Sequence, residues 1–142
     1  MRSLAVALAL LLAGATTAQP RLDTFDASRT SADITNQLLH HDVDGAAQAA
    51  ASLMEGPTAA KMKDVFQLVN GLGQGQYADL VYARDYGRTE KDVIYKIDFA
   101  KAFLFVRFLY HVDNGAWHLI HINVKTENDE PFPKEWTHIY PR

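Results

Sequence analysis

The sequence predicts an α+β fold, with two to three N-terminal helices packed on one face of a curved, cone-like antiparallel sheet of about four strands. Segment 93–124 is rich in Val, Ile, Phe and Tyr, which favour strands. Segment 28–72 instead carries apolar residues at helical spacing. Helices that all precede the strands are typical of the α+β class.

A hairpin turn divides the strand-rich segment, because Asn114 and Gly115 tolerate positive φ. A two-residue turn at 114–115 is one interpretation. A three-residue loop at 113–115, with Gly115 in a left-handed bulge position, is the other and places Phe108 opposite Ile120. We prefer the three-residue loop because it gives one almost wholly apolar face.

A second, weaker turn at 99–102 pairs Asp98 with Phe103 and agrees with this register. The face expected against the helices, the core face, carries Val93, Tyr95, Ile97, Leu104, Val106, Phe108, Tyr110, His118, Ile120, Ile122 and Val124. The opposite face, the back face, carries Ile94, Lys96, Asp98, Phe103, Phe105, Arg107, Leu109, His111, Trp117, Leu119, His121 and Asn123. The back face is too apolar to be a plain solvent-facing surface.

Residues 1–18 match a secretory signal peptide. A short positive start precedes the apolar run 4–13, and small residues at 16–18 form a cleavage site. The apolar run is too short to span a bilayer comfortably, although a retained anchor is the alternative. We expect cleavage after Ala18, a mature chain that begins at Gln19, a periplasmic or secreted location, and no membrane span after cleavage.

Length and composition predict one domain, residues 28–142, after a flexible lead-in at 19–27. The chain has no Cys, which excludes disulfides and a lipidated N-terminal Cys. The net charge of -3 and the scattered basic residues argue against nucleic-acid binding, which needs a basic patch.

The helical segment divides at its polar and glycine-containing positions. A helix is expected from about Ser28, with Ser28, Thr30 or Ser31 as its cap. A second helix is expected from Ala46 to Met54, although one bent helix is equally consistent with the break at 42–45. Thr58 is expected to cap a third helix. Its apolar stripe is Met62, Val65, Phe66, Val69 and Leu72.

Two further segments flank the central strands. Residues 77–86 predict a first strand whose imperfect alternation fits a sheet edge. The tail contains Pro131 and Pro133, which oppose regular structure. Its large apolar residues are expected to dock on an apolar surface: Phe132, Trp136, Ile139 and Tyr140.

Segment 95–126 contains YKIDFAKAFLFVRFLY, NGAWHL and INVKT. This pattern resembles small exported bacterial proteins of the nuclear transport factor 2-like superfamily and, more loosely, the cystatin-like folds. The superfamily includes isomerases, dehydratases, binding subunits and transport factors, so the resemblance implies a fold and no particular reaction. Its isomerase branch implies an acid inside the cone, and the predicted core face carries none.

Two clusters are candidate sites. The predicted ligand pocket in the cone is lined by Tyr82, Tyr95, Tyr110 and His118, unless these polar tips only lie at a wet core rim. The predicted interface on the back face consists of Phe105, Arg107, Trp117, His121 and Asn123, with Arg107 opposite His121. Lys96 and Asp98 are expected to lie beside these residues. A homodimer through this face is expected, because large apolar patches rarely stay bare.

The sequence carries no recognisable catalytic or metal motif. His118 and His121 are three apart, so on a regular strand they point to opposite faces and cannot share a metal. No serine lies in a recognisable nucleophile motif, and no cofactor is predicted. The preferred interpretation is therefore an exported, non-catalytic binding module with a small ligand or a protein partner. The alternative is a small isomerase or hydrolase that uses the Tyr/His pocket.

Overall fold

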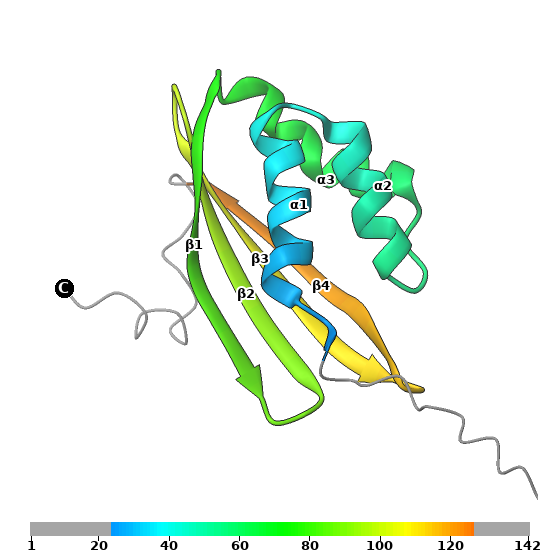
Figure 1. The fold of residues 1–142 in the computed structure, drawn as a ribbon. Coiled ribbons are helices and arrows are strands. Elements are labelled where there is room, and N and C mark those ends of the chain that lie inside the picture. Colours follow the sequence, from blue (N-terminus) through cyan, green and yellow to red (C-terminus); the bar gives the residue numbers. More distant parts are fainter. Residues whose placement is uncertain (1–23, 127–142) are drawn as a thin grey trace, which may run out of the picture.

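The computed structural model describes residues 24–126, and it confirms the α+β fold (Figure 1). The strands form one curved, open antiparallel sheet in the order β1-β2-β3-β4, and the helices cover one of its faces. The predicted signal peptide and C-terminal tail lie outside the described residues. The elements are α1 (Ala27–Leu39), α2 (Val43–Leu53), α3 (Ala59–Phe66), the 3-10 helix η2 (Gln67–Gly71), β1 (Gly75–Tyr86), β2 (Glu90–Phe99), β3 (Phe103–Asp113) and β4 (Ala116–Thr126).

Helix α1 begins earlier than the sequence predicts. Asp26 has an extended backbone, and its carboxylate accepts a hydrogen bond from the Arg29 N–H at 2.9 Å. The predicted caps Ser28, Thr30 and Ser31 are wrong because they lie inside the helix. The predicted flexible lead-in also extends too far, since Phe25 stacks on Trp117 with ring centroids 5.4 Å apart.

Helices α1 and α2 are separate. His41 adopts a positive φ of 60°, and Asp42 then caps α2 by accepting a hydrogen bond from the Gly45 N–H. The second helix therefore begins at Val43, three residues before the predicted Ala46. An aspartate directly after a left-handed residue supplies the break.

Helix α3 is capped by Thr58, as predicted. Its buried stripe is Met62 and Phe66 and continues to Val69 in η2. Val65, which was predicted to belong to this stripe, is instead 41% exposed. The core needs only the narrower set because α3 has just eight residues before it tightens into η2.

The β2–β3 register is as predicted, and the β3–β4 register is not. Asn114 and Gly115 form a two-residue turn with φ angles of 49° and 79°, as mirror-image hairpin turns require. Beyond the turn, a bulge at Ile120 shifts the pairing, so Phe108 lies opposite Ile122. The two-residue turn at 114–115 is therefore correct, and the preferred three-residue loop is wrong. The bulge at Ile120 brings Ile122 and Val124 onto the apolar face, which the three-residue loop was chosen to explain.

The bulge changes which β4 residues face the helices. Leu119 is 1% exposed and joins the core with Trp117, whereas Ile120 is 50% exposed. His118 lies between Trp117 and Leu119 and so points to the back face. The predicted core positions of His118 and Ile120, and the predicted back-face positions of Trp117 and Leu119, are wrong. In the structure the back face includes Tyr77, Asp79, Tyr82, Arg84, Tyr86, Glu90, Asp92, Ile94, Lys96, Asp98, Phe103, Phe105, Arg107, Leu109, His111, His118, His121, Asn123 and Lys125.

Candidate functional site

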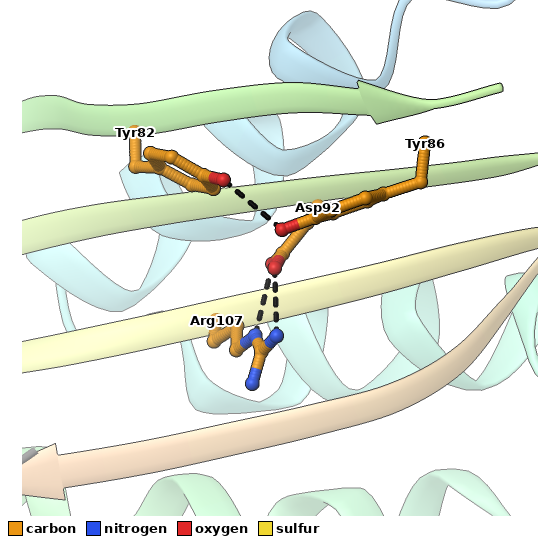
Figure 2. Close-up of polar contacts among 4 residues, drawn as sticks. All are labelled: Tyr82, Tyr86, Asp92 and Arg107. Carbon is orange, nitrogen blue, oxygen red and sulfur yellow. Dashed lines mark hydrogen bonds and ion pairs between the residues drawn. The ribbon is translucent and has the colours of Figure 1, made fainter. Parts of the chain in front are cut away.

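An ion pair lies at the centre of the back face. Asp92 of β2 is 2% exposed, and both of its carboxylate oxygens accept hydrogen bonds from Arg107 of β3. Nε donates at 2.9 Å and Nη2 at 2.7 Å (Figure 2). The two residues are diagonal neighbours, because Asp92 pairs with Leu109 and Arg107 with Ile94. The parallel, two-pronged geometry fixes both side chains.

A pair of tyrosines lies beside this ion pair. Tyr82 and Tyr86 are four residues apart on β1, so both project onto the back face, and their hydroxyls are 3.1 Å apart. The hydrogen bond with Tyr82 raises the pKa of Tyr86, and burial and the negative charge of Asp92 act in the same direction. Figure 2 shows the four side chains together on one side of the sheet. The hydroxyls of Tyr82 and Tyr86 thus lie next to a fixed charge pair.

Apolar side chains surround these polar groups. Ile94 is 2% exposed and Phe105 is 6% exposed, and Val81, Tyr82 and Phe103 pack against them. The site therefore combines a small apolar cluster with tyrosine hydroxyls and charges.

A second ion pair lies further along β2. Lys96 Nζ donates to both carboxylate oxygens of Asp98, at 2.7 and 2.8 Å, and lies 5.0 Å from the Phe103 ring centroid. Lys96 pairs with Phe105 and Asp98 with Phe103, so the prediction that both lie beside the interface residues is correct. The back face carries charges of both signs, each held in a defined geometry.

The structure brings most of the predicted interface residues together. Phe105, Arg107, His121 and Asn123 lie on the back face, although Arg107 pairs with Asn123 and not with His121. Trp117 does not belong to the set, since it stacks on Phe25 under the helix layer. The bulge accounts for both differences.

Asp92 and Tyr86 were missed by the sequence-based prediction. The predicted strand started at Val93, so Asp92 was not assigned to a face. The signal was present, because Asp92 is two residues before Ile94 and is a diagonal neighbour of Arg107 in the correctly predicted β2–β3 register.

The four predicted pocket residues do not line one cavity. Tyr95 and Tyr110 lie on the helix-covered face, whereas Tyr82 and His118 lie on the back face. The Tyr110 hydroxyl is 2.9 Å from the Ser31 hydroxyl, and the Tyr95 hydroxyl donates to the Ser28 carbonyl at 3.0 Å. These two tyrosines therefore attach α1 to the sheet.

A cavity of about 490 Å³ does open on the helix-covered face, beside the N-terminus of α1. Its walls include Asp26, Ala83, Asp85, Lys91 and Val93. None of the four predicted pocket residues lines it. Lys91 Nζ lies 2.9 Å from an Asp85 carboxylate oxygen and 5.3 Å from the Trp117 ring centroid, so its charge is already compensated.

The histidines of the sheet are closer together than alternation alone predicts. The bulge at Ile120 puts His118 and His121 on the same face, so the argument that separated them is wrong. His118 also pairs with His111, and the nearest carboxylate of each is 3.7 Å away, on Glu55 and Glu90 respectively. Even so, residues 24–126 contain no group of three or more His, Asp or Glu side chains placed to hold a metal.

Comparison with models of protein families, with curated proteins and with solved structures gives no match. In the part of the chain that the structure describes, no helix has the length and apolar character needed to cross a membrane.

Proposed function

We propose that the chain is an exported, non-catalytic binding module that binds a polypeptide partner on the back face, and that a second copy of the chain is this partner. The buried Asp92–Arg107 pair beside Tyr82 and Tyr86 carries the proposal. Arginine and tyrosine dominate binding hot spots, and a guanidinium already held by a carboxylate loses little freedom on binding.

The ionisable groups named above are bonded to other groups of the chain, which favours binding over catalysis. A general acid or base must exchange a proton with its substrate. Both carboxylate oxygens of Asp92 accept from Arg107, and the hydroxyls of Tyr95 and Tyr110 bond to α1. The enzyme alternative also required Tyr82 and His118 to share a pocket with Tyr95 and Tyr110, and they lie on opposite faces of the sheet.

The back face by itself is somewhat smaller than one side of a typical dimer interface. Four strands of about ten residues cover about 600 Å², at about 4.8 Å between strands and 3.3 Å per residue. Stable interfaces bury about 800 Å² per partner. The rim must therefore contribute, and Tyr86 and Tyr77 of β1 are 40% and 53% exposed.

Light scattering on the mature protein tests the proposed dimer, with an expected mass twice that of the chain. Tyr86→Asp should shift the mass toward the monomer, because it places a carboxylate beside Asp92 in the interface. Val65→Asp is the matched control, since Val65 is 41% exposed and lies on α3, away from the sheet. A wild-type monomer at tens of micromolar, or equal effects of the two variants, would contradict the dimer.

Export is tested by intact mass. Expression of the full gene in a bacterial host should yield a periplasmic or secreted protein whose mass begins at Gln19. Recovery of the full-length mass from the membrane fraction would contradict cleavage at Ala18.

A further inference from the structure

Three neighbouring side chains of the back face are nearly inaccessible in a single copy of the chain. Asp92 and Ile94 are each 2% exposed, and Phe105 is 6% exposed. The described helices all lie on the other side of the sheet (Figure 1). Val81, Tyr82 and Phe103 pack around Ile94 and Phe105 from the same face. This centre is therefore already shielded before any second copy binds.

We propose that the C-terminal segment of the same chain, residues 127–142, lies across the back face and occupies it until a partner displaces it. The proposal rests on the proposed function, because it supplies a built-in competitor for that binding surface.

The segment starts at a position from which it reaches the whole back face. Thr126 ends β4, the edge strand, opposite Leu104. Reaching Tyr86 from Thr126 means crossing three strand spacings, about 15 Å, and moving about 23 Å along the strands, from the level of Leu104 to that of His111. Sixteen residues remain after Thr126. Fully extended, they span about 50 Å. Length therefore allows the segment to reach Tyr82 and Tyr86.

The composition of the segment complements the back face. It contains four large apolar residues for the surface around Ile94 and Phe105. Pro131 and Pro133 lack the N–H that a strand ladder needs. This favours a segment that lies over the face rather than one that adds a strand at the edge of β4. The large apolar residues are Phe132, Trp136, Ile139 and Tyr140.

A spin label on the full mature chain tests this placement, and the absence of native cysteine makes the labelling selective. His121→Cys puts the label on an exposed back-face position. Asp44→Cys, on α2, puts it in the helix layer as the control. The label at 121 should broaden the amide NMR signals of Phe132 and of residues 134–140, and the label at 44 should not. No broadening from 121, or equal broadening from both, overturns the proposal.

A mixed sample separates placement within one chain from placement between copies. Nitrogen-15 protein without label is combined with labelled protein of natural isotope content. Occupation within the chain predicts that the broadening disappears in this mixture. Broadening that persists in the mixture shows that the segment lies on another copy and overturns the proposal.

The competition itself is tested in the full-length variant Phe132→Ser/Trp136→Ser. Weaker occupation should tighten dimerisation at least tenfold in dissociation constant, measured by sedimentation. If wild type and variant dimerise equally, the competition is overturned while the proposed dimer stands. If neither dimerises but the label at 121 still broadens the segment, the dimer fails and the intrachain contact stands.

Discussion

A carboxylate at the centre of a sheet face loses its water, and Asp92 recovers that loss through two hydrogen bonds from Arg107. The net stabilisation by such a pair is small, but removal of one partner leaves an uncompensated charge. Asp98 was predicted to lie on the same face as Arg107, and it does. Asp98 is bonded to Lys96, so Asp92 is the residue that depends on Arg107.

Arg107→Met should lower the free energy of unfolding by about 3–5 kcal/mol, because Asp92 stays buried without its partner. Urea titration provides the measurement. The double variant Asp92→Leu/Arg107→Met should recover most of the loss. Lys63→Met breaks the exposed pair with Asp44 and should cost at most about 1 kcal/mol. Equal losses for Arg107→Met and Lys63→Met would mean that the back-face pair is effectively in water.

Burial raises the pKa of Tyr110 to about 12, although its hydrogen bond with Ser31 acts in the opposite direction. An unfolded tyrosine titrates near pH 10, so the folded state holds this proton more tightly. The stabilisation is complete below about pH 10 and is lost as the pH rises through about 12.

The free energy of unfolding should therefore fall more steeply above pH 10 in wild type than in Tyr110→Phe. The difference should reach roughly 2–3 kcal/mol near pH 12, from a pKa difference of about two units. Urea titrations at several pH values give the comparison. Tyr77→Phe, at a position 53% exposed, should keep the wild-type steepness. The same steepness in Tyr110→Phe would mean that Tyr110 is ionised without unfolding.

At the level of secondary structure, the bulge in β4 decides which of two adjacent apolar residues is in the core. Leu119 is 1% exposed and Ile120 is 50% exposed. Leu119→Ala should cost about 2–5 kcal/mol, and Ile120→Ala less than about 1 kcal/mol. Thermal or urea unfolding measures both. The reverse order would restore the register with Phe108 opposite Ile120.

The elements differ in how much of their geometry the sequence signals. The β2–β3 register is predictable because loops of two and four residues give the same pairing of Asp98 with Phe103. The β3–β4 register is not, because Ile120 carries no mark of a bulge and an apolar residue there fits either face. The N-cap Asp26 was missed because three hydroxyl residues just after it are equally good caps by type.

On the scale of the whole molecule, the sheet has two faces with different contacts. The helices are held on one face by apolar packing and by the bonds of Tyr95 and Tyr110 to α1, and a cavity opens beside the N-terminus of α1. The back face holds charges, tyrosines and apolar residues in fixed positions. The α+β class and most of the predicted interface followed from residue alternation. The predicted Tyr/His pocket is wrong because residue alternation alone cannot locate a bulge. His118 lies between the turn and the bulge, where it pairs with His111 and faces the back of the sheet.

Hydroxyl-radical footprinting of the mature protein at low and at high concentration tests most directly whether the back face is a binding surface. Tyr86 and His121 should lose reactivity as the concentration rises, because both lie exposed on that face. Val65 of α3 should keep its reactivity. Reactivities of Tyr86 and His121 that do not change with concentration, or an equal loss at Val65, would contradict the proposed interface.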